Sequence, residues 1–185
     1  MRIIAGKYRG RKLTAPEGTV TRPTSDRARE AVFNVLDSRL RKNGTAWSDL
    51  AVLDMFAGTG ALGAEALSRG AKALFAAEKD PAAVRCFYQN IDPFIKDGVP
   101  VFLFPDALDP PPARAVAGIV FMDPPYNKGL VAPSLKQLLQ KGWIDQNTLC
   151  VIEKERHEQN ILPPGFELFD SRVYGKAEIL FSGLI

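Results

Sequence analysis

Two periods of hydrophobic and polar positions alternate along most of the chain. After residue 50, short apolar runs are separated by longer stretches in which apolar residues recur every three or four positions. Short apolar runs are typical of buried strands, and the longer period is typical of amphipathic helices. The pattern predicts strands at 51–56, 73–77, 101–104, 119–122 and 148–153, and helices at 62–68, 81–95 and 133–141.

This alternation predicts an α/β fold, with a mostly parallel central sheet and helices on both of its faces. Two further apolar runs, 166–174 and 177–181, lie close together in the sequence and predict a terminal antiparallel hairpin. Three prolines at 110–112 exclude a helix there. An apolar face over 28–40 predicts a helix that precedes the sheet. We therefore expect a single Rossmann-like domain over residues 1–185, with a catalytic core at 50–185, a leading helix at 25–42 and an N-terminal arm at 1–24.

Composition agrees with one soluble domain. The chain has 185 residues, of which 46% are hydrophobic and 24% are charged, values that are ordinary for a globular protein. No apolar stretch approaches the roughly 20 residues that a membrane-spanning helix needs. The first residues also lack the apolar core of a secretory signal. We expect a cytoplasmic protein without a membrane partner.

The charge is distributed unevenly. The formal net charge is +3, yet residues 1–42 hold 11 Lys and Arg against 4 Asp and Glu. The arm alternates cations with glycines and one tyrosine, a composition that lets a backbone approach phosphates and an aromatic ring stack on a base. A basic end on a mildly acidic body predicts a polyanionic partner at that end. The candidate nucleic-acid contacts are Lys7, Tyr8, Arg9, Arg11, Lys12 and Arg22.

Cysteine and histidine are scarce. Cys86 and Cys150 are far apart and form no CxxC pattern, so both are expected to be reduced and buried. The one histidine, His157, lies among charged residues as in a surface loop. Zinc sites need clusters of these residues, and we therefore expect no metal. The chemistry is expected to depend on carboxylates, backbone groups and aromatic rings.

A glycine-rich segment follows the first predicted strand. Gly58, Gly60 and Gly63 have the spacing of dinucleotide-binding loops, and Glu78 ends the next strand, where an acid can bind ribose hydroxyls. Taken alone, this pattern favours a nicotinamide or flavin enzyme as much as a methyltransferase.

Two further acids favour S-adenosylmethionine as the cofactor. Asp54 directly precedes the glycine-rich segment, where a carboxylate would repel a pyrophosphate but attract an ammonium or a sulfonium. Asp106 follows the third strand, where it can accept a hydrogen bond from an adenine amino group. With Glu78, these acids would lie at the carboxyl ends of three successive strands, the edge at which α/β sheets bind ligands.

The tetrapeptide Asp123-Pro124-Pro125-Tyr126 follows the fourth strand. An exocyclic base amine is a poor nucleophile because its lone pair is delocalised into the ring. If the Asp123 carboxylate and the Pro124 carbonyl accept its two N–H bonds, the lone pair is freed and the developing positive charge is stabilised. Tyr126 could stack on a base that has left its helix or loop. Asp123, Pro124 and Tyr126 are therefore the candidate catalytic residues.

These motifs together resemble the Rossmann-like amino-methyltransferases, and the chain is most similar to bacterial enzymes that methylate N2 of a guanine in 16S ribosomal RNA. Further marks of the resemblance are Met1–Leu13, Arg22–Asn34 and Tyr174–Phe181. The resemblance implies a monomer that acts on ribosomal RNA in a small-subunit particle. It also implies that Phe56 and Thr24 lie at the cofactor. The prolines at 110–112 depart from the family, which has a helix after the third strand, and leave the shape of the adenine pocket open.

Two other functions stay open at this stage. An adenine-N6 methyltransferase acting on RNA or DNA would present the same kind of amine to the same tetrapeptide. A non-catalytic RNA-binding module for ribosome assembly could have kept the fold, although it would not need Asp54, the glycines and Asp123 together. A nicotinamide oxidoreductase is disfavoured by the charge of Asp54.

Overall fold

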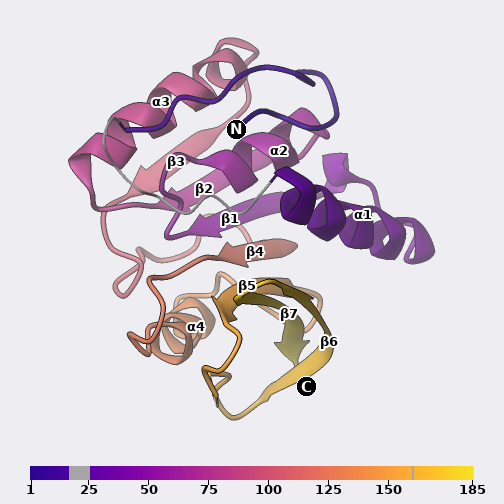
Figure 1. The fold of residues 1–185 in the computed structure, drawn as a ribbon, viewed down its shortest axis with the longest axis vertical. Coiled ribbons are helices and arrows are strands. Elements are labelled where there is room, and N and C mark those ends of the chain that lie inside the picture. The colour runs from indigo at the N-terminus through magenta and orange to yellow at the C-terminus, as the bar shows by residue number, and fades with distance from the viewer. Residues whose placement is uncertain (17–25, 160) are drawn as a thin grey trace.

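The computed structural model describes residues 1–16, 26–159 and 161–185, which form one seven-stranded sheet with helices on both faces (Figure 1). The strands are β1 (Ala51–Met55), β2 (Ala73–Ala77), β3 (Val101–Phe104), β4 (Ile119–Met122), β5 (Leu149–Glu155), β6 (Phe166–Tyr174) and β7 (Ala177–Leu184). The α-helices are α1 (Asp26–Lys42), α2 (Ala61–Ser68), α3 (Pro81–Lys96) and α4 (Val131–Gln140).

The strand order is β3-β2-β1-β4-β5-β7-β6, and the first five strands are parallel. β1 lies between β2 and β4, so that Leu53 pairs with Phe75 on one side and with Val120 on the other. The chain changes direction across the sheet at this point, and ligands bind at the carboxyl ends of strands beside such a switch point. The expected fold class is confirmed.

The terminal hairpin is also confirmed, in an arrangement that the sequence pattern did not show. β7 pairs antiparallel with β5, and β6 forms the outer edge of the sheet through β7. The last strand in the sequence is therefore an inner strand. Its buried residues Ile179, Leu180 and Phe181 contribute to both faces of the core.

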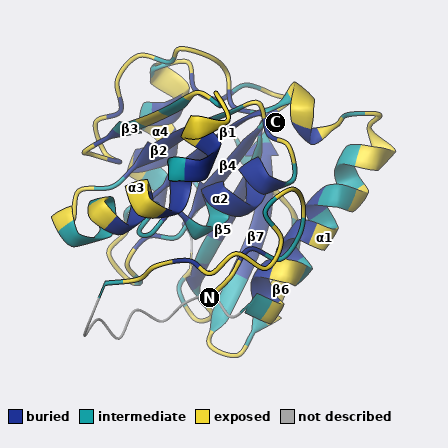
Figure 2. Cartoon of the chain, turned by 90° about the horizontal axis from the view of Figure 1, so that it is seen from above, coloured by how far each residue is buried: buried dark blue, intermediate teal, exposed yellow. Residues whose placement is uncertain are grey.

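Different helices cover the two faces of the sheet. Helices α1, α2 and α3 pack on one face, where Phe33, Leu36 and Phe87 are fully buried. Helix α4 packs on the other face through Leu135 and Leu138. Figure 1 shows α4 on the opposite side of the strands from α1 and α2. In Figure 2 the buried residues, coloured dark blue, follow the strands that lie between these layers.

Residues 105–118 contain no helix, as the proline run predicts. Trp143 covers this part of the sheet instead. Its indole Nε1 donates to the carbonyl of Pro111 at 2.7 Å, and its ring centroid lies 4.8 Å from that of Phe75. A tryptophan with its one donor satisfied can fill a gap that a helix would otherwise close.

Some element boundaries differ from the expected ones. Helix α1 extends beyond 28–40 at both ends, and β7 continues to Leu184 rather than ending at 181. Helix α4 begins at Val131, two residues before Pro133. Proline is tolerated in the first turn because its missing N–H has no intrahelical acceptor there.

The N-terminal residues form part of the body rather than a separate arm. Arg2 and Lys12 form an antiparallel bridge, and Ile3 is 1% exposed. The fully buried carboxylate of Glu65 on α2 accepts the backbone N–H groups of Ile4 and Ala5 at 2.7 and 3.0 Å. Residues 1–13 of the expected N-terminal arm thus pack on α2, which accepts the backbone N–H groups of Ile4, Ala5, Lys7 and Tyr8.

Gly6 shows how tightly this segment lies on α2. Its φ angle is 80°, and a Cβ at this position would stand 1.8 Å from the carbonyl oxygen of Ser68. The next residue, Lys7, donates its backbone N–H to the same oxygen at 2.7 Å. Only glycine allows this approach.

Cys86 and Cys150 are free and buried, as expected, and His157 lies on the surface. Among the described residues, no helix is both long enough and apolar enough to span a bilayer.

Candidate active site

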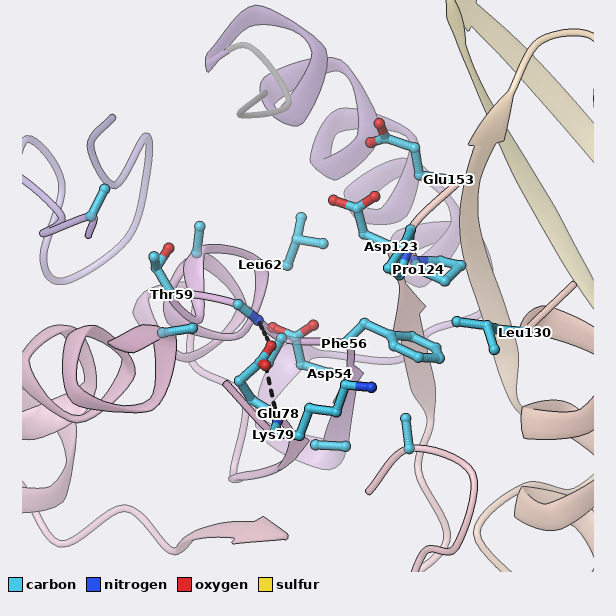
Figure 3. Close-up of a pocket in the computed structure, with 18 of the residues that line it drawn as sticks. Asp54, Phe56, Thr59, Leu62, Glu78, Lys79, Asp123, Pro124, Leu130 and Glu153 are labelled. Carbon is cyan, nitrogen blue, oxygen red and sulfur yellow. Dashed lines mark hydrogen bonds between the residues drawn. The ribbon is translucent and has the colours of Figure 1, made fainter. Parts of the chain in front are cut away.

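A cavity of about 780 Å³ opens at the carboxyl ends of the parallel strands (Figure 3). Its walls come from the loops after β1, β2, β3 and β4, from the end of β5 and from the N-terminal segment. The predicted residues that line it are Asp54, Phe56, Gly58, Glu78, Asp106, Asp123, Pro124 and Tyr126. The structure thus brings the predicted cofactor and catalytic residues to one space.

Asp54 lies at the floor of the cavity and is 2% exposed. Its Oδ2 accepts the backbone N–H of Gly63 at 2.9 Å, which ties the end of β1 to α2. The pKa of the Asp54 carboxyl is raised to about 8, chiefly by burial; the Gly63 bond lowers it, and the charges of Asp123 and Glu78 contribute to the rise. A cation bound beside Asp54 would favour the ionised form of this carboxyl, which burial otherwise disfavours.

Glu78 joins the glycine-rich segment to the end of β2. Its Oε2 accepts the N–H of Gly58 at 2.8 Å, and its Oε1 accepts those of Lys79 and Asp80 at 2.9 and 2.8 Å. Figure 3 shows the Glu78 carboxylate beside that of Asp54, with two of these bonds dashed. Three backbone donors hold the side chain in one orientation at the cavity wall.

Three residues of the glycine-rich segment, Phe56, Gly58 and Gly60, have left-handed backbone angles. Phe56 has a φ of 61°, which is rare for a bulky residue and is found most often at functional sites. Gly60 has a φ of 75°, and a Cβ there would lie 2.6 Å from the ring of Phe87. Packing against Phe87 therefore explains the glycine at position 60, whereas Phe56 lines the cavity.

Asp106 stands at the exposed rim of the cavity. Its Oδ1 accepts the N–H of Leu108 at 2.8 Å, and this bond orients the carboxylate in the turn after β3. The rim position is compatible with contact to an adenine amino group from the side.

The Asp123-Pro124-Pro125-Tyr126 turn is anchored to the neighbouring strand β5. The Tyr126 hydroxyl donates to Oε1 of Glu153 at 2.6 Å, and Asn127 Nδ2 donates to Oε2 of Glu155 at 3.4 Å. Asp123 is half-buried. The pKa of the Asp123 carboxyl is raised to about 7, chiefly by burial and in part by the negative charge of Glu153.

Glu153 is a candidate site residue that the sequence reasoning missed. It lines the cavity, and Figure 3 shows its carboxylate beside that of Asp123. The signal was available, because Glu153 ends a predicted strand as Asp54 and Glu78 do, and the same strand-end argument applies to it.

The candidate nucleic-acid contacts differ in their availability. Lys7 Nζ and the Tyr8 hydroxyl both bind Oδ2 of Asp97, at 2.7 and 2.6 Å, and hold the pKa of that carboxyl below its usual range. Residues Arg9, Arg11 and Lys12 are exposed. Arg22 and Thr24 lie outside the described residues. Because Leu13, Ala15 and Pro16 line the cavity, the basic segment borders it.

Comparison with known proteins identifies the family. The model of the family described as "Conserved hypothetical protein 95" matches residues 1–183. The chain belongs to this family. It is 34% identical over 178 residues to "Ribosomal RNA small subunit methyltransferase D" of Escherichia coli (strain K12), covering 95% of this chain and 86% of that protein. It is 31% identical over 160 residues to "Putative rRNA methyltransferase YlbH" of Bacillus subtilis, covering 84% and 83%.

A solved member of similar shape supports the same grouping. The "Putative methyltransferase yhhF" from Escherichia coli superposes with a TM-score of 0.80 and 32% identity, covering 100% of this chain and 97% of the other. The two chains thus share the overall fold. Among the residues described here, no group of three or more His, Cys, Asp and Glu is placed to hold a metal ion.

Proposed function

We propose that this protein transfers a methyl group from S-adenosylmethionine to the exocyclic N2 amine of a guanine in small-subunit ribosomal RNA. One observation carries the proposal: Asp123 and Pro124 share a cavity with Asp54 and Glu78 of the glycine-rich edge. The names of the relatives point to ribosomal RNA of the small subunit as the substrate. We further propose that the protein acts as a monomer in the cytoplasm, on RNA within a small-subunit particle.

The residues at the β1–β2 side of the cavity fit S-adenosylmethionine. Asp54, Glu78 and Asp106 provide carboxylates for an ammonium, ribose hydroxyls and an adenine amino group. A pyrophosphate would face the same carboxylates and be repelled. The cofactor, when bound, supplies an electrophilic methyl group on a positively charged sulfur. The pKa of the Asp54 carboxyl is raised in the absence of a ligand, and a bound cation would lower it and so favour the ionised carboxylate.

The residues on the β4–β5 side hold the amine for attack. The Asp123 carboxylate and the Pro124 carbonyl accept its two N–H bonds, which directs the nitrogen lone pair away from the ring. The Asp123 carboxylate would stabilise the positive charge that develops on the nitrogen when it accepts a methyl group from the cofactor. The nitrogen then loses one proton, which Asp123 can accept because its pKa lies near 7.

The test is a methylation assay with three substrates: deproteinised ribosomal RNA, small-subunit particles and duplex DNA. We expect N2-methylguanosine in the digested ribosomal RNA. N6-methyladenosine would show an adenine enzyme instead, and label in DNA alone would overturn the proposal. Absence of both transfer and calorimetric cofactor binding would favour a non-catalytic RNA-binding module.

An Asp123→Asn variant tests the role of the tetrapeptide. We expect transfer to fall by about 100-fold or more, while the dissociation constant for the cofactor changes by less than about threefold. Asp92→Asn is the matched control, because Asp92 is a partly exposed residue of α3 whose ion pair among the described residues is with Lys96. Equal loss of binding and transfer in Asp123→Asn would show that Asp123 has a structural role.

A further inference from the structure

Glu153 lies on β5, and Asp123 directly follows the neighbouring parallel strand β4. β4 and β5 pair in register at Phe121↔Val151 and Met122↔Ile152, and Asp123 and Glu153 are the residues that come next after the last of these pairs. Alternation along a strand places them on the same face, and adjacent strands lie about 4.8 Å apart. Both side chains line the cavity, and Figure 3 shows the two carboxylates directed into the same part of it.

Two carboxylates so close together impose an electrostatic cost. The charge of Glu153 contributes to the raised pKa of Asp123. The hydrogen bond from the Tyr126 hydroxyl does not require a negative charge at position 153, because a neutral glutamine oxygen would accept it equally well. Two neighbouring carboxylates that line one cavity can accept two adjacent hydrogen-bond donors of a ligand.

We propose that Glu153 selects guanine by accepting the N1–H of the target base, while Asp123 accepts an N–H of the neighbouring N2 amine. Guanine presents these donors side by side on its Watson–Crick edge, and enzymes that extrude a base commonly read this edge. The inference rests on the proposed function and assigns Glu153 as the residue that determines which base is methylated.

Adenine does not match a pair of carboxylates. Its N6 amine could donate to Asp123, but its N1 has a lone pair and no hydrogen. That lone pair would face the Glu153 carboxylate, and a buried acceptor without a donor is costly. Sites built to bind a donor reject analogues that lack it by large factors, up to about 10⁴–10⁵. Glu153 thus separates guanine N2 from adenine N6, which the tetrapeptide alone does not do.

A base analogue provides the direct test. 2-Aminopurine keeps the amine on C2, but its N1 carries no hydrogen. Once the target nucleotide has been mapped, small-subunit RNA with guanine or 2-aminopurine at that position can be assembled by ligation and reconstituted into particles. The ratio of kcat/KM for the two substrates is then measured with wild-type protein, Glu153→Gln and Tyr126→Phe. Because the ratio compares substrates on one enzyme, any unfolded fraction cancels.

We expect wild-type protein to prefer guanine by about 100-fold or more. In Glu153→Gln the ratio should fall at least about tenfold, because the glutamine amide can donate to an unprotonated N1. Tyr126→Phe removes the hydroxyl bond but leaves the Glu153 charge, so it should keep the wild-type ratio.

Three results would overturn the inference alone: a wild-type ratio near one, an unchanged ratio in Glu153→Gln, or an equal fall of the ratio in Tyr126→Phe. The last would mean that Glu153 acts only by positioning Tyr126. No transfer to guanine by wild-type protein, or N6-methyladenosine as the product, would overturn the proposed function and this inference with it.

Discussion

Asp54 and Asp123 keep carboxyl groups in places where burial disfavours their ionised forms. Burial raises their pKa values to about 8 and about 7, from an ordinary value near 3.8. Neither side chain has a salt-bridge partner among those found in the described residues. In the absence of a ligand, such groups lower the stability of the folded state at neutral pH. Their retention in one cavity is explained by a ligand that carries positive charge or N–H donors.

The first prediction concerns stability and Asp54→Asn. Because the folded pKa of Asp54 is above the unfolded value, its contribution to stability is fully present below about pH 4 and is lost as pH rises through 8. Asparagine keeps the acceptor for Gly63 without a charge. We expect Asp54→Asn to be more stable than wild-type protein at pH 8.5 by at least about 1 kcal/mol, and to bind S-adenosylmethionine much more weakly.

Thermal unfolding at pH 8.5 and pH 5, with calorimetric titration of the cofactor, would measure both effects. The stability gain should shrink at pH 5, where wild-type Asp54 is already neutral. A variant that is less stable than wild-type protein at pH 8.5 would contradict the assignment of Asp54 as an acid whose ionised form is disfavoured by burial.

The second prediction concerns the pH dependence of transfer. Asp123 can accept an N–H only when it is ionised, and its pKa is raised to about 7. At saturating cofactor, kcat/KM for RNA should therefore fall about tenfold per pH unit below 7. Glu153→Gln removes a neighbouring negative charge, which lowers the pKa of Asp123 and should move this acid limb to lower pH. An unmoved limb would mean that another group controls it.

At the scale of elements, the N-terminal segment combines two roles. Its backbone is held by α2 through Glu65, while the side chains of Arg9, Arg11 and Lys12 are exposed to solvent. Lys7 and Tyr8 are instead engaged with Asp97 at the end of α3. The free cations are thus fixed on a rigid support, which suits contact with a folded RNA.

The third prediction follows from this division. Replacing Arg9, Arg11 and Lys12 by glutamine together should weaken RNA binding and lower the magnitude of the slope of log K against log salt by about 2–3. The fold should remain, because none of the three side chains is buried. Arg172 and Lys176 on the β6–β7 hairpin provide a control pair, whose replacement should leave the slope unchanged. A slope equal to that of wild-type protein in the triple variant would exclude these cations as phosphate contacts.

At the scale of the whole molecule, the N-terminal segment is part of one cooperative structure. Removing residues 1–13 would leave the Glu65 carboxylate, now 0% exposed, without two of its donors, and would uncover the core around Ile3. Glu65 would keep its ion pair with Arg69 at 2.9 Å, but a buried carboxylate that loses two hydrogen bonds is destabilising. The fourth prediction is that this deletion lowers the melting temperature by about 5 °C or more, measured by circular dichroism, whereas the triple glutamine variant melts as wild-type protein does. Equal melting of the deletion and wild-type proteins would contradict the packing role.

Most of the architecture was predictable because the periodicity of hydrophobic positions and the ends of strands can be read from short stretches of consecutive residues. Asp54, Glu78 and Asp123 could be placed together from the rule that ligands bind at strand ends, and the same rule would have found Glu153. The docking of residues 1–13 could not be predicted, because a glutamate such as Glu65 in a helix gives no sign that its partners lie some 60 positions away. The pairing of β5 with β7 rather than with β6 could likewise not be predicted, because the two apolar runs are similar and the packing of the whole core decides between them.

The inner position of β7 has a consequence for how the protein is made. Strand β5, which carries Glu153, has β4 on one side and β7 on the other, and β7 is completed only at Leu184. At about 5–20 residues per second, the nascent chain spends several seconds with β5 as an open sheet edge after that strand has been synthesised. During this interval Cys150, Val151 and Ile152 lack the neighbour that buries them. A chaperone or the translating ribosome that covered this edge would therefore limit its association with other chains.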